Sequence, residues 1–350
     1  MVLKKKIRVL IVEDSKVNQG LLKGLLTEDP DFEVAGIAGN GFEAVSFLST
    51  NRVDVVSMDI MMPGMDGVEA TRQIMKTTPV PIVIVSSFYS PSEIKMSFSI
   101  LEAGALTILP RPYGPGHLMF QQTARQYRST LKMMSEVKVK PIRRYPAEAN
   151  RKPVLLSVSA SEYKIIAIGA SAGGSQAIQV ILNQLPSTIP VPVLFVQHID
   201  PHFAQGYCEW LGSTSNLPIH IASDGDTLLP GHVYMAPGDF HLGLKGPGTV
   251  AVTQTPPEKR LRPSVAFLFR SVLNFYGKNT IAILLSGMGA DGAEELKMLR
   301  DCGAFTIAQD AQSSLVHGMP GEAIRLGGAF CILSPEAIVK EIDKLFQNQL

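Results

Sequence analysis

Residues 163–174 read YKIIAIGASAGG, an apolar run that gives way abruptly to small residues. The run predicts a buried strand that turns sharply into a helix, which is the repeating unit of a parallel α/β sheet. A turn of this kind can bind a phosphate through the free N–H groups of the helix. It can also present a serine oxygen as a nucleophile, in the pattern G-x-S-x-G.

The residues around this turn favour the serine interpretation. Gly169, Gly173 and Gly174 fit neither G-x-G-x-x-G nor a P-loop. A dinucleotide site would also place an acidic residue at the end of the next strand, but that strand, VPVLFVQH (191–198), ends in His198. A histidine and a serine at the ends of neighbouring strands are a general base beside a nucleophile. We therefore predict that Ser171 is the nucleophile and His198 its base.

A third residue is needed to orient the histidine. Asp291 lies in the glycine-rich turn of IAILLSGMGADGAEEL (281–296), between a predicted strand and a predicted helix. As alternatives, Asp291 could cap that helix, His202 is the strongest rival base, and other carboxylates lie in loops (Asp200, Asp224, Asp226, Asp239). The N–H groups of this turn, together with that of Ala172, can stabilise an oxyanion.

The order of these residues in the chain is serine, histidine, aspartate. The α/β-hydrolases have the order serine, acid, histidine. We therefore expect a doubly wound parallel sheet whose strand order differs from that fold.

The first half of the chain repeats the same alternation. Five apolar runs predict a five-stranded parallel, flavodoxin-like sheet that ends near residue 127: IRVLIV, FEVAGIA, VDVVSMD, PIVIVSS and ALTILP. Glu13, Asp14 and Asp59 follow two of these runs, where carboxylates gather at one edge of the sheet. Strand-end carboxylates can be helix caps, but three together suit Mg²⁺. Ser86 and Arg111 are then placed to contact a phosphoryl group.

Between the halves, residues 135–153 carry three prolines and many charges without an apolar period. This pattern predicts a linker, flexible or formed by a short helix, over residues 128–161 between domains at 1–127 and 162–350.

The net charge of +1 over 350 residues gives no nucleic-acid signature. Three cysteines without a C-x-x-C pair and the lack of a long apolar run predict a reduced, cytoplasmic protein that does not enter the membrane.

The first half resembles the response-regulator receiver domain, through the motifs VEDS, MDIMMPGMDG, VSS and GALTILPRP. The resemblance implies that Asp59 accepts a phosphoryl group and that Glu13, Asp14 and the backbone carbonyl of Met61 join it in binding Mg²⁺. Receivers usually have a lysine where this chain has Arg111, and an aromatic residue where it has Ile108. Both differences bear on how phosphorylation is transmitted.

The second half resembles the chemotaxis methylesterase family CheB. The motifs are AIGASAGG, FVQHI, LLPGHVYMAPGDFHLGL, RPSVAFLFRSV, LLSGMGADGA and LVHGMP. The resemblance implies a triad of Ser171, His198 and Asp291, with the N–H of Met288 as an oxyanion donor beside that of Ala172. Ala266 stands where the family often has aspartate.

The same resemblance implies the substrate and the partners. We expect hydrolysis of glutamyl methyl esters, and deamidation of glutamines, on the cytoplasmic domains of methyl-accepting chemoreceptors, with no cofactor for the ester reaction. A chemotaxis histidine kinase would phosphorylate Asp59 and release a receiver that covers the esterase cleft at rest, on a protein peripheral to the receptor arrays. Two alternatives are a receiver-gated esterase or amidase of another chemosensory pathway, and a phosphorylation-dependent docking module without activity.

Overall fold

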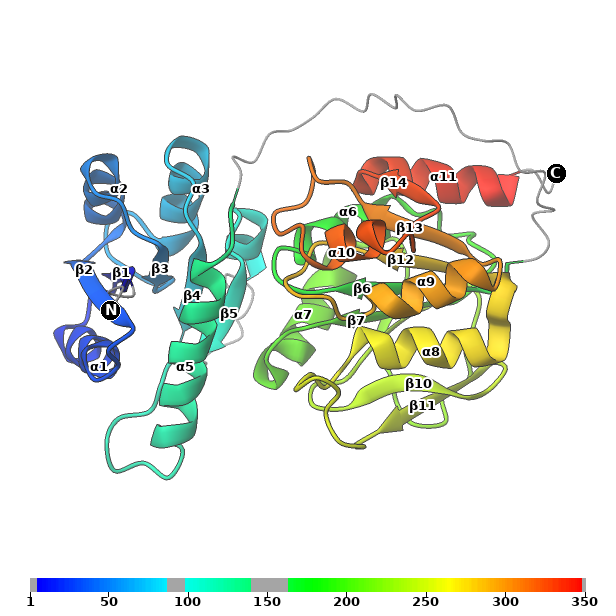
Figure 1. Cartoon of the computed structure of the whole chain (residues 1–350), viewed down its shortest axis with the longest axis horizontal. Helices are drawn as coiled ribbons and strands as arrows, with labels where there is room; N and C mark the ends of the chain where they lie inside the picture. Colours follow the sequence, from blue (N-terminus) through cyan, green and yellow to red (C-terminus); the bar gives the residue numbers. More distant parts are fainter. Residues whose placement is uncertain (1–4, 87–97, 140–162, 348–350) are drawn as a thin grey trace. The chain divides into compact units, whose positions relative to one another are not determined.

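The computed structural model describes residues 5–86, 98–139 and 163–347, and the chain divides into two compact units at residues 143 and 144 (Figure 1). Each unit is built around its own parallel sheet with helices between successive strands. This architecture confirms the α/β class expected for both halves.

The first unit contains a five-stranded parallel sheet in the order β2-β1-β3-β4-β5, which is the flavodoxin-like order. All five strands lie within the apolar runs that predicted them. The strands are β1 (Ile7–Val12), β2 (Phe32–Ala38), β3 (Val55–Met58), β4 (Ile82–Ser86) and β5 (Thr107–Pro110). The helices include α1 (Lys16–Thr27), α2 (Gly41–Thr50), α3 (Gly67–Thr77) and α5 (Phe120–Ser135), and residues 98–102 are also helical.

Short polar residues start three of these helices. Ser15, Asn40 and Asp66 each accept a hydrogen bond from a backbone N–H in the first turn of α1, α2 and α3, respectively. The central strands are buried on both faces, as in other parallel sheets. Helix α5 is joined to them by buried Tyr127, whose hydroxyl donates to Ser57 Oγ at 3.0 Å. The parallel pairing of neighbouring strands places the carboxyl ends of β1, β3, β4 and β5 along one edge.

The second unit contains a seven-stranded parallel sheet in the order β14-β13-β12-β6-β7-β9-β8. Its strands are β6 (Ile165–Ala170), β7 (Val193–Gln197), β8 (Ile219–Ile221), β9 (Val233–Met235), β12 (Thr280–Leu284), β13 (Phe305–Gln309) and β14 (Cys331–Leu333). A separate antiparallel hairpin is formed by β10 (His241–Gly246) and β11 (Thr249–Thr253).

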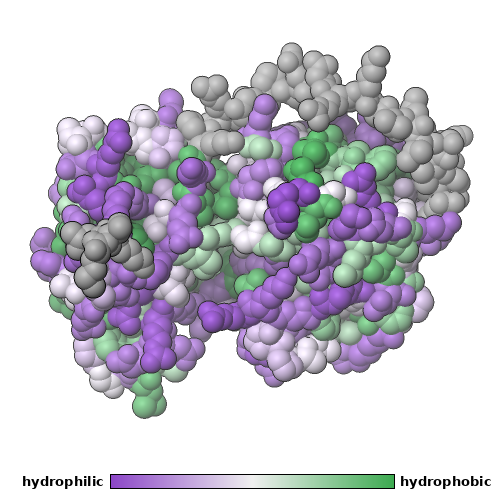
Figure 2. Space-filling view, viewed as in Figure 1, coloured by the Kyte–Doolittle hydropathy of each residue, from purple (hydrophilic) through white to green (hydrophobic). Residues whose placement is uncertain are grey.

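Two groups of helices cover this sheet (Figure 1). One group is α6 (Ser175–Gln184), α7 (Pro201–Thr214) and α11 (Pro335–Gln347), and the other is α8 (Val265–Tyr276), α9 (Ala293–Asp301) and α10 (Met319–Arg325). The hairpin packs against α8. Hydrophilic side chains cover the outer surfaces of α8 and α9 in Figure 2, so the apolar faces of these helices are turned inward.

The expected domain bounds of 1–127, 128–161 and 162–350 stay a prediction, because residues 140–162 lie outside the described part of the chain. Helix α5 continues past residue 127 and ends at Ser135, so the helical pattern extends further than the sequence suggested. Among the described residues, no helix is long and apolar enough to cross a membrane.

Candidate active site and acidic pocket

The centre of the seven-stranded sheet brings the three predicted catalytic residues to one edge. Strand β6 pairs with β7 on one side and with β12 on the other, and their registers place Gly169 opposite Val196 and Leu284. Ser171 follows β6, His198 follows β7, and Asp291 lies in the turn after β12. Because helices α6 and α9 leave toward opposite faces, this edge is the crevice where open α/β sheets bind ligands.

His198 and Asp291 are in direct contact. The Nε2 atom of His198 lies 3.0 Å from Asp291 Oδ2, and both side chains are largely buried. A carboxylate can only accept here, so Nε2 carries the proton and Nδ1 keeps its lone pair. The aspartate therefore selects the tautomer in which Nδ1 of His198 can act as a base.

Three further donors hold the Asp291 carboxylate. Ser264 Oγ donates at 3.0 Å, and the backbone N–H groups of Val265 and Ala266 donate at 2.7 and 3.1 Å. These residues begin helix α8, so Asp291 caps a neighbouring helix rather than α9, whose N-cap is Gly292. Ala266, the position where an aspartate is expected from the family resemblance, donates through its backbone N–H, so this contact does not depend on its side chain.

Burial and hydrogen bonding act on Asp291 in opposite directions. Burial favours the neutral acid, but the hydrogen bond and charge of His198 and the N–H groups of Val265 and Ala266 outweigh it and lower the pKa of Asp291. The carboxylate is therefore ionised at neutral pH. An ionised Asp291 can stabilise His198 when it becomes an imidazolium.

Ser171 is fixed by its backbone and is half-buried. Its N–H donates to Ser286 O at 3.0 Å, and its carbonyl accepts from Gln197 Nε2 at 2.9 Å. In the described residues no hydrogen bond joins Ser171 Oγ to His198. The structure thus brings the two strand ends together without a hydrogen bond between the predicted nucleophile and the predicted base, a contact that often forms only when substrate is bound.

The turn after β12 approaches Ser171 closely because residue 287 is a glycine. A Cβ built on Gly287 would lie 2.8 Å from Ser171 Cβ and 2.2 Å from Met319 Sδ. The N–H groups of Ala172 and Met288, one on each side of this contact, donate to no acceptor in the described part of the chain. Two free donors beside a serine are what an oxyanion requires.

The rival residues are engaged elsewhere. Asp200 caps α7 and holds His202 at 2.7 Å, a contact that leaves His202 largely exposed. The remaining three accept from other partners: Asp224 from Lys245, Asp226 from Ser223 N, and Asp239 from Arg262. In the described structure the side chain of His198 makes its hydrogen bond and ion pair with Asp291 and with none of these four carboxylates.

Sequence reasoning missed the residues that support the site. Ser264 precedes an apolar helical run, a pattern that indicates a helix cap but not a contact with Asp291. Buried Ser286 donates from Oγ to Ala172 O at 2.9 Å, and its N–H donates to Gln309 Oε1 at 2.7 Å. These contacts connect three strand ends, and nothing in a single sequence pairs residues so far apart.

The first unit gathers its acidic residues as expected. Side-chain oxygens of Glu13, Asp14 and Asp59 lie within 4.8 Å of one another at the ends of β1 and β3. Arg111, after β5, places Nη2 3.0 Å from both Glu13 Oε2 and Asp59 Oδ1. The backbone N–H of Arg111 also donates to the backbone carbonyl of Ser86 at 2.9 Å, so the ends of β4 and β5 are joined beside the carboxylates.

Electrostatics in this pocket favours a bound cation. Burial raises the pKa of Asp59 to about 6, with a further contribution from Glu13, although Arg111 and the N–H of Ile60 act against it. Glu13 Oε2 is buried and, despite its proximity to Arg111, makes no hydrogen bond with any residue that the structure describes. Three clustered carboxylates with spare acceptor capacity fit Mg²⁺. The side chain of Met61 is half-exposed nearby in the chain, and Ile108 is buried within β5.

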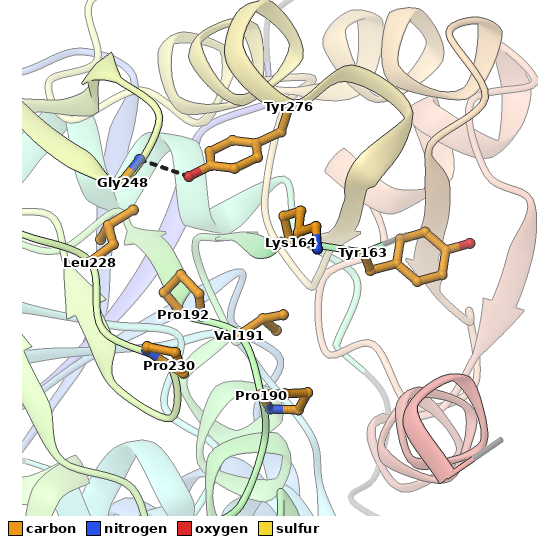
Figure 3. A pocket seen from close by; sticks show the side chains of 9 residues that line it. All are labelled: Tyr163, Lys164, Pro190, Val191, Pro192, Leu228, Pro230, Gly248 and Tyr276. Atoms are coloured by element: carbon orange, nitrogen blue, oxygen red, sulfur yellow. Dashed lines mark hydrogen bonds between the residues drawn. The ribbon is translucent and has the colours of Figure 1, made fainter. Parts of the chain in front are cut away.

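A surface cavity of about 460 Å³ lies at the other edge of the second sheet (Figure 3). Lys164, Pro192 and Pro230 line it just before β6, β7 and β9 begin, and the Tyr276 hydroxyl accepts from Gly248 N at 2.9 Å beside it. Because the predicted catalytic residues follow the carboxyl ends of strands, this cavity is separate from the candidate active site.

Comparison with known proteins identifies both units. The family model for CheB methylesterase matches residues 166–342, and the response regulator receiver domain model matches residues 9–121. A protein-glutamate methylesterase/protein-glutamine glutaminase of Geobacter metallireducens is 49% identical over 346 residues, covering 97% of this chain and 99% of the relative. One of Nitrosospira multiformis is 47% identical over 345 residues, covering 97% of each chain.

A solved structure supports the assignment of the second unit. The crystal structure of the Thermotoga maritima CheB methylesterase catalytic domain matches with a TM-score of 0.51 and 37% identity. The match covers 52% of this chain and 98% of that domain.

Proposed function

The chain belongs to the CheB methylesterase family, and from that premise we propose that it is a receiver-controlled protein-glutamate methylesterase of chemotaxis. The observation that carries the proposal is the 3.0 Å contact between His198 and Asp291 at the strand end next to Ser171. It supplies an oriented base beside a serine, which is the requirement for acyl transfer.

In the proposed reaction, Ser171 Oγ attacks the carbonyl carbon of a glutamyl methyl ester, and its proton moves to His198 Nδ1. The N–H groups of Ala172 and Met288 stabilise the oxyanion. His198 then protonates the departing methoxide, which leaves as methanol and gives an acyl-serine. Water, deprotonated by His198, hydrolyses that acyl-enzyme to free glutamate and Ser171.

Deamidation of glutamine follows the same route, with ammonia as the leaving group. His198 Nδ1 carries the proton that the departing nitrogen needs. The relatives' printed names include both activities, and the site proposed here requires no additional residue for the second.

The receiver pocket is proposed to regulate this reaction. Asp59 accepts a phosphoryl group from a histidine kinase. Glu13, Asp14, Asp59 and the carbonyl of Met61 would hold Mg²⁺, which would supply positive charge to the incoming phosphoryl oxygens. Ser86 and Arg111 contact those oxygens. The substrates are chemoreceptor cytoplasmic domains, and we place the protein in the cytoplasm beside the receptors.

The test is release of radiolabelled methanol from methylated receptor membranes. The full chain should release methanol, and Ser171→Ala should reduce turnover by on the order of a millionfold while the circular dichroism spectrum stays unchanged. Near-normal release by a folded Ser171→Ala protein would remove this residue from the mechanism. Absence of release by the unaltered chain, with and without acetyl phosphate, would overturn the methylesterase proposal and favour a docking role.

A further inference from the structure

Backbone strain in the described residues is concentrated in one corner of the second unit. Only three residues other than glycine have a positive φ there: Asp239 at 61°, Lys259 at 48° and Arg260 at 72°. We call residues 237–240 and 254–262 the strained corner. The second of these segments connects β11 to the start of α8 in Figure 1. Such conformations persist only where the surrounding structure enforces them, and they cluster at functional sites.

Two of the strained residues form the tip of a tight turn. Glu258 N–H donates to Leu261 O at 3.0 Å, and Leu261 N–H donates to Glu258 O at 2.8 Å, which leaves Lys259 and Arg260 as a two-residue loop. Positive φ at both positions defines a type I′ turn, for which Asn-Gly is strongly preferred. A lysine and an arginine occupy these positions despite that preference.

The base of the turn is anchored by ionic contacts. Arg262 donates from Nε and Nη2 to Asp239 Oδ1 at 3.0 and 2.9 Å, and from Nη1 to the carbonyls of Gln254 and Thr255. Arg270 binds both Glu258 and Glu295. The turn is therefore held rigidly, although its tip projects into solvent.

The two cations at the tip are almost unpaired. Both side chains are exposed, and the contact of Lys259 is a distant one, with Nζ 3.9 Å from Glu294 Oε2. Arg260 makes no ion pair or side-chain hydrogen bond within the described ranges. Neither the fold nor the triad therefore accounts for two charged residues in this strained conformation.

The strained corner borders the catalytic residues on two sides. The chain runs from Arg262 through Pro263 into Ser264 and Val265, both of which hold Asp291. On the other side, a Cβ on Gly238 would lie 2.6 Å from Pro201 Cα, at the helix start that closely follows His198. The tip of the turn is also near Asp291 in space, because Lys259 Nζ lies 3.9 Å from Glu294 Oε2, three residues after Asp291.

We propose that Lys259 and Arg260 dock the carboxylates that flank the ester on an acidic polypeptide substrate. The inference rests on the proposed function. Each hydrolysed ester or deamidated glutamine leaves a carboxylate, so a substrate with several such sites becomes acidic around those that remain. A guanidinium binds a carboxylate through two parallel hydrogen bonds, and a rigid turn presents it with little loss of entropy.

The experiment compares two synthetic peptides with the full chain. Both carry one γ-methyl glutamate, flanked by glutamates in one peptide and by glutamines in the other. Lys259→Asn with Arg260→Gly replaces the tip by the preferred turn sequence without charge. This double variant should raise KM for the acidic peptide by about tenfold and leave kcat within about twofold, since exposed charge pairs mainly affect encounter and binding. KM for the glutamine peptide should change by less than about twofold.

Three controls separate docking from a structural effect. Arg260→Lys, which keeps both positive charges at the tip, should retain most of the preference for the acidic peptide. Lys340→Gln, which removes an exposed cation from α11, should not alter it. The preference should also shrink at about 1 M salt. Relief of strain should raise the Tm of the double variant by about 2–4 °C, so that docking weakens while the fold becomes more stable.

An equal change in KM for both peptides, or a fall in kcat alone, would overturn the proposal and assign the turn to access or to architecture. Retention of the acidic preference by the double variant would also overturn it. Each of these three results leaves the proposed function unaffected as long as the glutamine peptide is hydrolysed through Ser171. Failure to hydrolyse either peptide or methylated receptor would instead contradict the methylesterase assignment.

Discussion

Asp59 follows β3 in the receiver unit, Asp291 follows the end of β12 in the esterase unit, and both are more than nine-tenths buried. Their surroundings act on them in opposite directions. Burial raises the pKa of Asp59 to about 6, whereas the pKa of Asp291 is lowered despite its burial. The difference lies in the partners. Asp291 accepts from His198, Ser264, Val265 and Ala266. Asp59 accepts from the N–H of Ile60 and faces Arg111 together with the carboxylates of Glu13 and Asp14.

The comparison shows how the same sheet edge can serve two chemistries. A carboxylate surrounded by donors stays ionised and orients a base, so it needs no additional ligand. A carboxylate that lies beside other carboxylates has too little positive charge around it, so it is suited to bind a cation and to receive a phosphoryl group. The predictions below alter one side of this comparison at a time.

Among changes to the two aspartates and their partners, the largest effect is expected at Asp291. Asp291→Asn keeps the shape of the residue, but its amide cannot stabilise the imidazolium and can hold His198 in the wrong tautomer. Turnover on methylated receptor should fall by roughly ten-thousandfold, measured as methanol release. A loss of less than about tenfold would mean that Asp291 is only a cap for α8, and Asp200 would then be the residue to test.

Phosphorylation should have the next largest effect. Acetyl phosphate with Mg²⁺ is expected to raise the initial rate of methanol release by roughly thirtyfold, which corresponds to about 2 kcal/mol between the resting and active states. Asp59→Asn should abolish the response without lowering the resting rate. Arg111→Lys introduces the lysine expected from the resemblance to receiver domains, and it shows whether the arginine limits the size of the response. Activation that persists in Asp59→Asn would place the phosphoacceptor elsewhere.

Ser264→Ala tests how much the donors around Asp291 matter. The variant removes one donor from the carboxylate and the side-chain cap of α8, so turnover should fall by about tenfold and stability by about 1 kcal/mol. Ser334→Ala is the matched control, because Ser334 Oγ accepts from Ala337 N at the start of α11, away from Asp291. An equal loss of turnover in both variants would show a general effect of cap removal.

The two units should respond to pH in opposite ways. Folded Asp59 binds its proton more tightly than the unfolded chain does, so its contribution to stability is full below pH 3.8 and is lost as the pH rises through about 6, by roughly 3 kcal/mol without metal. Asp291 contributes stability above its ordinary pKa of 3.8, which is lost as the pH falls through its lowered pKa.

Unfolding scans of the full chain should therefore show one transition that weakens between pH 4 and pH 6 and recovers with Mg²⁺. In Asp59→Asn this transition should become independent of pH over that range. A Mg²⁺-sensitive transition with the same pH dependence in the variant would show that Asp59 is not the group responsible.

Much of both sheets could be predicted because buried parallel strands leave continuous apolar runs, and residues at their ends must share an edge. That argument brought His198 and Asp291 together from distant parts of the chain. It could not find the pairing of Ser264 with Asp291 or of Ser286 with Gln309, because such contacts depend on how helices and turns pack. The strained Lys259–Arg260 turn has no sequence signal, since its residues are unfavourable for that conformation.

The central claim is that Ser171 is an activated nucleophile. A fluorophosphonate forms a covalent bond with the oxygen of such a serine and releases fluoride, and peptide mass spectrometry locates the adduct. With the full chain, acetyl phosphate and Mg²⁺, one phosphonyl group should appear on Ser171 in step with the loss of methanol release, and labelling should be strongly slowed in Asp291→Asn. Inactivation by an adduct on another residue, or full labelling of Ser171 with activity retained, would contradict the account.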